Sequence, residues 1–263
     1  MKLDYATLIS PHPLKIPNIG HIKSIKLKEI FCSDTMDYSL YNFYISFLML
    51  TPETYFEQIN VSKREWYDTL TDDQKEELLL FDIICTDTNL QKTYSEVFNF
   101  FIIENMKWDE EVKGFWTYTD LDTEGNIIPT GLIHKNVFQE LCDIILQRCA
   151  LSQRDIDNDC TNIRSQKARN TLKIFKKNRK KKLQNRKRNK STELPNLISA
   201  LASKSNLTYS TIWDLTVYQL YDQFRREQGN VYFDIQKMSV AAYGNKEKTF
   251  KGDEWFAYLE DMN

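Results

Sequence analysis

The sequence predicts a mainly helical protein with one small β-hairpin, built from an acidic α-rich N-terminal unit, a basic helical connector and a small all-α C-terminal unit. Three observations predict this fold class. Apolar residues recur at helical spacing through most of the chain, only seven glycines and six prolines interrupt them, and the charge is segregated along the sequence. With 263 residues, 41% of them hydrophobic, the chain has enough material for two folded units.

The charge pattern sets the predicted boundaries. Residues 1–150 carry 24 acids and 13 bases, a net charge of −11. Residues 164–190 carry 14 bases and no acid, so the basic charge is local although the whole chain has a net charge of −2. We therefore expect an acidic domain over residues 1–151, a basic helical linker over 152–192 and a small helical domain over 193–263.

The first domain begins with an extended entry, because three prolines disfavour a helix early in residues 12–31. Leu40, Tyr44, Phe47 and Leu48 then follow a helical period. The sequence Thr51-Pro52-Glu53 supplies an N-cap, a first-turn proline and a first-turn acid, which predicts a short helix to about Ile59.

A capping box at Thr71 and Gln74 predicts the next helix, which should run to about Thr86. Another helix is expected over residues 89–103. Strand-favouring residues 108–118 and 126–133 flank a turn at 122–125, which predicts a β-hairpin. A helix over residues 135–151 should close the domain.

The C-terminal domain should be entirely helical. Residues 193–203 predict one helix and residues 210–229 a stronger one, capped by Ser210 or Thr211 and ended by Gly229. Residues 230–244 predict a third helix that stops at Gly244, and residues 253–262 a short aromatic one.

No catalytic motif is present in the sequence, which lacks the GxGxxG, GxxxxGK[ST] and GxSxG patterns. The segment from Asp120 resembles a calcium loop, but its twelfth position is Gly131 where a bidentate acid is required. The three histidines lack zinc spacing. We therefore expect no enzyme activity, no catalytic residue, no cofactor and no metal.

The cysteines and the hydropathy indicate a soluble protein of a reducing cytoplasm. Five cysteines form no CxxC pair, and their odd number fits poorly with a disulfide framework. The N-terminus lacks the apolar stretch of a secretory signal. No apolar run approaches the roughly 20 residues that span a bilayer. We expect a protein that is not secreted.

The basic segment over residues 164–190 leaves three interpretations open. It contains few apolar residues, so it can be a solvated helical connector, or it can dock on an acidic protein surface. It can also neutralise phosphates of a nucleic acid. The residues that would bind nucleic acid are Lys176, Lys177, Arg179, Lys180, Lys181, Lys182, Arg186, Lys187 and Arg188.

The helix predicted over residues 210–229 has an apolar stripe of Trp213, Val217, Leu220, Tyr221 and Phe224. Such a stripe is typical of a core, yet the aromatics exceed what a small domain needs inside, and aromatic residues are common anchors at interfaces. Tyr218, Gln219, Asp222 and Arg225 should lie off the stripe and be dispensable for folding. The residues predicted to bind a partner are Trp213, Tyr218, Tyr221 and Arg225.

Several segments of the sequence resemble a known family. They are ISPHPLKIPNIGHIKSIKLKEI and LTPETYF within residues 1–60, and ELPNLISALASKSN, IWDLTVYQLYDQFRR and YFDIQKMSVAAYG within residues 193–263. These segments resemble tail-associated proteins of bacteriophages that infect Firmicutes, particularly tail assembly chaperones.

The resemblance implies a non-enzymatic helical protein in the bacterial host cytoplasm. It would bind the tape-measure protein and keep its long apolar helices soluble until tail-tube subunits polymerise around it. Other phage tail proteins are possible partners, and self-association stays open. The resemblance transfers no site residue. The alternative is a nucleic-acid-binding accessory protein that acts through residues 164–190.

Overall fold

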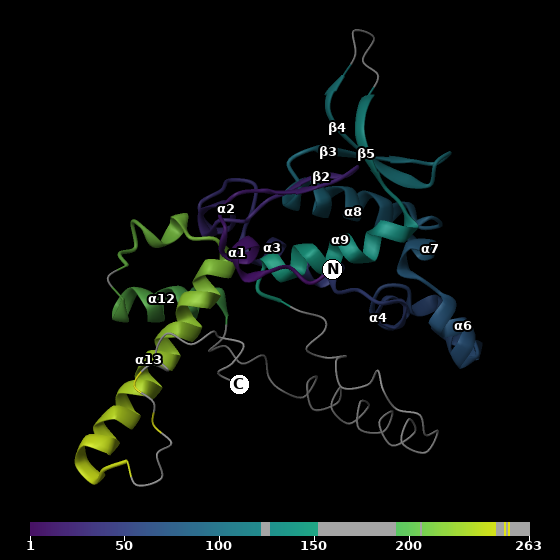
Figure 1. Cartoon of the computed structure of the whole chain (residues 1–263). Coiled ribbons are helices and arrows are strands. Elements are labelled where there is room, and N and C mark those ends of the chain that lie inside the picture. Colours follow the sequence, from purple (N-terminus) through teal and green to yellow (C-terminus); the bar gives the residue numbers. More distant parts are fainter. Residues whose placement is uncertain (122–126, 152–192, 206, 246–249, 251, 253–263) are drawn as a thin grey trace. The chain divides into compact units, whose positions relative to one another are not determined.

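The computed structural model of the chain describes residues 1–121, 127–151, 193–205, 207–245, 250 and 252 (Figure 1). The chain forms two compact units, Met1–Asp159 and Cys160–Asn263. The predicted basic linker, residues 152–192, and the predicted terminal helix, residues 253–262, lie outside the described residues.

The first unit combines short helices with two small antiparallel sheets. Its helices are α1 (Tyr5–Ile9), α2 (Leu27–Phe31), α3 (Tyr38–Leu48), α4 (Pro52–Gln58), the 3-10 helix η1 (Val61–Lys63), α5 (Arg64–Thr69), α6 (Asp72–Glu77), α7 (Leu80–Ile84), α8 (Thr88–Phe101) and α9 (Lys135–Arg148). Its strands are β1 (Leu14–Ile16), β2 (Gly20–Ile22), β3 (Asn105–Asp109), β4 (Gly114–Leu121) and β5 (Ile127–Ile133).

The core of this unit is rich in aromatic side chains and centres on α8. The predicted stripe of that helix is confirmed, because Leu90, Tyr94, Val97, Phe98 and Phe101 are all buried. The Phe98 ring meets those of Phe115 and Phe138 edge to face, with centroids 5.5 and 5.9 Å apart. Such pairs add to the free energy of burial, so α8 is the element on which the other parts of the unit pack.

The predicted fold class is wrong in its β-structure. Residues 108–118, predicted as a single strand, contain the end of β3, a turn and the start of β4, so the hairpin is a three-stranded sheet in the order β3-β4-β5. The turn contains Lys113 in the left-handed region, with φ of 50°. That conformation is rare for residues other than glycine, and the turn positions 110–113 themselves contain no Gly or Asn, although Gly114 follows them as the first residue of β4.

A second sheet, β1-β2, lies in the predicted extended entry. Its hairpin is held against the rest of the unit by main-chain hydrogen bonds: Lys23 N donates to Phe101 O, 2.8 Å, and Leu132 N donates to Asn18 O, 3.0 Å. Two sheets among the helices make this a mixed α/β fold and not a mainly helical one with one hairpin. The paired residues of β1 and β2 lie only four to eight positions apart in the sequence, and Asn18 adopts a φ of 59° between the strands. This hairpin therefore has a local turn signal, which the prediction of a simple extended entry did not use.

The predicted helix starts are confirmed at Thr51 and Thr71, each of which accepts a hydrogen bond from a first-turn backbone N–H. The predicted length of the second helix is wrong. Instead of running to Thr86, it ends at Leu78, whose extended backbone separates α6 from α7. Because the backbone is extended at Leu78 and Leu79, α7 can bury its apolar side chains while α6 stays at the surface.

The second unit contains α12 (Leu194–Lys204), the 3-10 helix η3 (Ile212–Asp214) and the long helix α13 (Val217–Tyr243). A capping box of Thr216 and Gln219 starts α13, five or six residues after the predicted cap. The predicted end at Gly229 is wrong, because the helix continues through it to Gly244. A glycine inside a helix costs only about 1 kcal/mol relative to alanine, which neighbouring residues can offset.

Among the described residues, no helix has both the length and the apolar character that crossing a membrane requires. The four described cysteines are free thiols. Burial raises the pKa of the Cys149 thiol to about 12, so this thiol stays protonated at neutral pH.

Candidate protein-interaction surface

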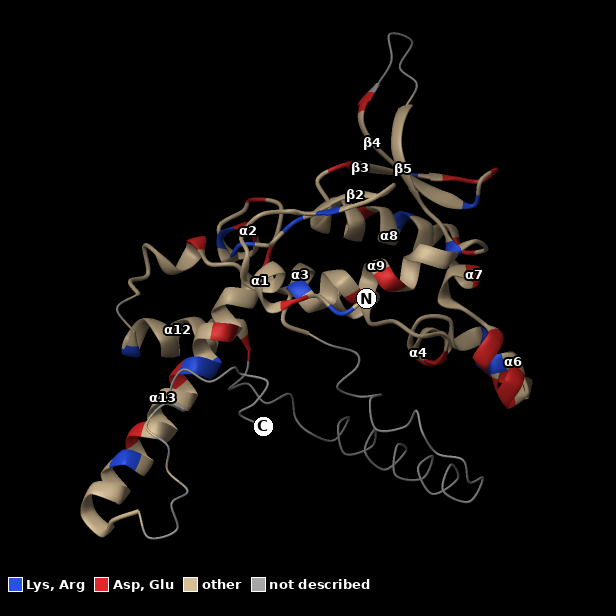
Figure 2. Ribbon diagram, in the orientation of Figure 1, with Lys and Arg blue, Asp and Glu red and all other residues tan. Residues whose placement is uncertain are grey.

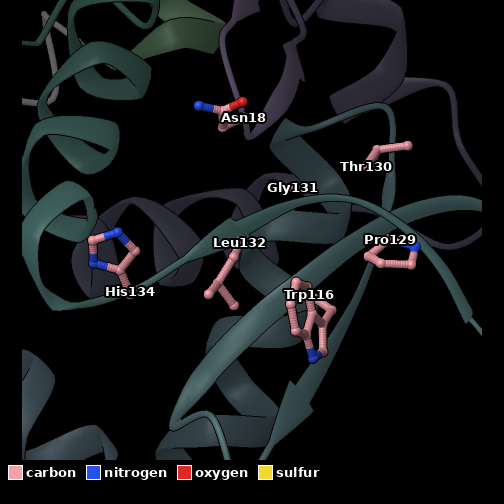
Figure 3. Close-up of a pocket in the computed structure, with 7 residues that line it drawn as sticks. All are labelled: Asn18, Trp116, Pro129, Thr130, Gly131, Leu132 and His134. Carbon is pink, nitrogen blue, oxygen red and sulfur yellow. The ribbon is translucent and has the colours of Figure 1, made fainter.

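A shallow depression of about 370 Å³ lies beside β5 in the first unit (Figure 3). It is lined by Asn18, Trp116, Pro129, Thr130, Gly131, Leu132 and His134. It contains no carboxylate, and the backbone N–H of Asn136 already donates to its only imidazole, at 3.2 Å. The depression therefore lacks the paired titratable groups that acid–base or nucleophilic catalysis needs.

Within the described residues, no group of three or more His, Cys, Asp or Glu side chains could hold a metal ion. Part of the calcium-like loop, residues 122–126, lies outside the described residues, while Gly131 belongs to β5. The predicted absence of a metal, of a cofactor and of catalysis stays a prediction.

The clearest candidate surface is a stripe of apolar side chains along α13. An α-helix turns about 100° per residue, so Val217, Leu220, Phe224, Val231, Ile235 and Met238 fall on one face. Seven-residue steps relate Val217, Phe224, Val231 and Met238, which is the spacing by which one helix packs along another.

The two halves of this stripe differ in exposure. Val217 and Leu220 are buried, and α12 packs on α13. In contrast, Val231, Ile235 and Met238 are 38%, 56% and 64% exposed. We call these three residues the exposed stripe. It continues the packed face in the same register, with no packing partner among the described residues that covers it.

Two tyrosines of α13 are also exposed, Tyr232 beside the exposed stripe and Tyr243 at the end of the helix. Tyrosine is enriched at protein interfaces because it has a large apolar ring and a polar tip. On another face of the helix, the Phe233 ring contacts Phe250 with centroids 5.2 Å apart. That contact leaves the exposed stripe itself open.

The residues predicted to bind a partner lie at the start of this helix. Tyr218 and Tyr221 are half-buried, as is Trp213 in η3, whereas Arg225 is exposed. Trp213, Tyr218 and Tyr221 already interact with other residues of the chain. The structure therefore brings these four residues near the packed end of the stripe, and their role in binding stays a prediction.

Asp222 differs from its prediction. It was expected to lie off the apolar stripe and to be dispensable for folding, yet its side chain is buried and forms an ion pair with Arg226 Nε at 3.4 Å, one helical turn away. Its substitution should therefore affect the fold. The basic residues predicted to bind nucleic acid, from Lys176 to Arg188, all lie outside the described residues.

The sequence does not predict the exposed stripe, because Gly229 is a typical helix end. The sequence pattern places Val231, Ile235 and Met238 on a separate helix over residues 230–244. The signal that could have revealed the continuous helix is the seven-residue spacing, which runs across Gly229 without a change of register.

A family model described as YomV second domain matches residues 184–260. The match includes α12, η3 and α13, together with the last part of the basic segment. No curated protein and no solved structure matches the chain. The family name is phage-derived, so the match supports the coarser part of the resemblance, a Firmicutes phage protein, and does not specify a tail assembly chaperone.

Proposed function

We propose that this protein is a non-enzymatic phage protein that binds apolar helices of tail proteins during assembly, with the tape-measure protein as its partner. The observation that carries the proposal is the exposed stripe of Val231, Ile235 and Met238 on α13. The resemblance to tail assembly chaperones and the phage-derived family name agree with it.

The shape of the surface favours a helix as the partner. A stripe with alternating steps of four and three residues fits into the groove between side chains of a second helix. A chaperone for long apolar helices needs such a surface open before binding, since burial of apolar area drives the association. Because α13 is already helical, little further ordering opposes binding.

Co-expression with the tape-measure protein tests the proposal. The unaltered chain should keep that protein in the soluble fraction and be captured with it. The double variant Ile235→Glu/Met238→Glu places two charges on the exposed stripe and should abolish both effects, because two unpaired charges would have to be desolvated at the interface.

A matched control separates loss of the surface from a change of charge. Asn230→Glu/Lys237→Gln changes the net charge of the same helix by the same amount, on exposed positions away from the stripe. This control should retain solubilisation and capture. Equal loss in both variants, or full capture by the stripe variant, would contradict the proposal.

The charge of +14 over residues 164–190 favours one second candidate, nucleic-acid binding. Fluorescence anisotropy with a labelled duplex would detect it, and binding should weaken steeply as salt rises. Deletion of residues 164–190 should remove that binding and leave capture of the tape-measure protein intact. DNA affinity that survives the deletion would place the nucleic-acid site elsewhere.

A further inference from the structure

A second surface lies in the first unit, on residues 51–79, which we call the acidic arm. The arm comprises α4, η1, α5 and α6 and contains eight acids and three bases. Figure 2 shows the acidic residues of α6 gathered at the edge of this unit. Charge alone does not define a site, because acidic helices are commonly solvated.

The acidic arm also exposes large apolar side chains. Ile59, Val61 and Trp66 are all exposed, and they come from α4's end, η1 and α5, which pack on one another. Trp66 is 50% exposed. Scattered single apolar residues need no explanation, but these three lie within eight residues of the chain on elements that pack on one another, and exposed apolar side chains grouped in this way are typical of an interaction site.

The Trp66 ring is held in place from one side. It meets Phe56 edge to face, with centroids 5.6 Å apart, and Phe56 stacks on Tyr67 at 4.9 Å. Phe56 and Tyr67 are buried, so the indole rests on a fixed aromatic base. A tryptophan that is ordered before binding loses little entropy in a complex and is a frequent hot spot.

The bases of the arm do not cancel its acids. Arg64 is bound between Glu57 and Asp68, with nitrogen–oxygen distances of 2.9 Å to each. The Lys75 ammonium lies over the Tyr67 ring, 5.2 Å from its centroid. The exposed carboxylates of Glu65, Asp73, Glu76 and Glu77 form no ion pair within the described part of the chain.

We propose that the acidic arm docks a cationic amphipathic helix of a partner protein. The apolar stripe of that helix would cover Ile59, Val61 and Trp66, and its Lys or Arg side chains would pair with the surrounding carboxylates. A cation over the exposed indole face adds a further attraction. The negative field of the arm attracts such a helix and repels a nucleic acid or an acidic peptide.

This inference is independent of the proposed function, since it rests on residues of the other unit. The probe is a synthetic 18-residue peptide with Leu at helical positions i, i+3, i+4 and i+7 and Lys elsewhere. Its affinity for the full chain would be measured by anisotropy at about 150 mM salt, where long-range attraction is largely screened. A peptide with Glu in place of Lys should not bind, and one without Leu should bind at least about tenfold more weakly.

Two sets of variants locate the binding. Neutralising Glu65, Asp73, Glu76 and Glu77 to amides should weaken binding about tenfold or more. The control neutralises four exposed acids of the same unit outside the arm, Asp34, Glu110, Glu111 and Asp120, and should change affinity less than about threefold. Equal loss in both sets would overturn the proposal, because attraction would then come from net charge alone.

Substitutions of Trp66 test the apolar contribution to binding. Trp66→Ala should weaken binding about tenfold and Trp66→Leu less, because leucine keeps apolar area and loses the aromatic face. Ile103→Ala, at an exposed position outside the arm, should leave affinity unchanged. Circular dichroism would confirm that each variant is folded, and unchanged affinity in folded Trp66→Ala would overturn the proposal.

Discussion

Two helices of this protein, α8 and α13, follow the same sequence pattern and have different surroundings. On α8, five apolar side chains are sealed by helices and strands of the first unit. On α13, the corresponding stripe is buried only where α12 packs and is exposed beyond it. Amphipathic periodicity thus identifies the apolar face of a helix, and only the neighbouring elements decide whether that face is core or interface.

The largest expected effect is a loss of stability on substitution in the buried helix α8. Phe98→Ala should lower the free energy of unfolding of the first unit by about 3–5 kcal/mol, because it removes a fully buried ring and leaves a cavity. Met238→Ala on the exposed stripe should change stability by less than about 0.5 kcal/mol. Urea unfolding measures both changes, and similar losses would remove the distinction between the helices.

A smaller effect is expected where β5 approaches the N-terminal hairpin. A Cβ at Gly131 would collide with the backbone of Asn18, whose carbonyl accepts the Leu132 N–H. Gly131→Ala should therefore destabilise the first unit by about 1–3 kcal/mol, since neither backbone can yield easily. Thermal unfolding checks this, and an unchanged melting temperature would show that the hairpin is not held as described.

The stability of the first unit should depend on pH through Glu104. The Glu104 carboxylate is buried, which alone would raise its pKa, but hydrogen bonds from His21 lower the pKa below the ordinary value. The backbone N–H of His21 donates at 2.7 Å, and its Nδ1 lies 2.7 Å from the other carboxylate oxygen.

A lowered folded-state pKa means that this stabilisation is present above the unfolded-state pKa of about 4.3 and is lost as pH falls through the folded value. Glu104→Gln should cost about 1–2 kcal/mol at pH 7 and flatten the fall in stability between pH 5 and pH 3, the range expected for a lowered carboxyl pKa. Urea unfolding across this range is the measurement, and an unaltered slope in the variant would exclude Glu104 as its source.

The smallest effect tests the continuity of α13. Gly229 lies inside this helix, so Gly229→Ala should stabilise the second unit by about 0.5–1 kcal/mol. If the helix ended there in a left-handed cap, the same substitution would destabilise it. Thermal unfolding gives the sign.

Local signals predicted several elements correctly. The capping residues Thr51 and Thr71 and the stripe of α8 appear where the sequence places them, because caps and helical periodicity depend on residues a few positions apart. The β1-β2 sheet and the extra strand β3 were missed although both pair with a strand nearby in the sequence. The strands β1 and β2 have only three residues each, too few to show an alternating pattern, and the turn over residues 110–113 contains no Gly or Asn.

The sequence predicts the binding surface at the start of α13, whereas the structure exposes the apolar stripe in its second half. The aromatic residues near Trp213 predict a binding surface, yet Trp213, Tyr218 and Tyr221 interact with other residues of the chain. The apolar side chains of α13 are exposed where the shorter helix α12 does not pack on them. The apolar stripe of α13 alone does not indicate how long its neighbouring helix is.

Hydrogen exchange of the full chain, alone and in complex with tape-measure protein, tests the central claim most directly. Alone, amides of residues 229–243 should exchange far faster than those of α8, because Val231, Ile235 and Met238 in that half of α13 are exposed, whereas the apolar face of α8 is buried. In the complex these amides should become protected while those of α8 stay unchanged. Strong protection of residues 229–243 in the chain alone, or no added protection on binding, would contradict the account.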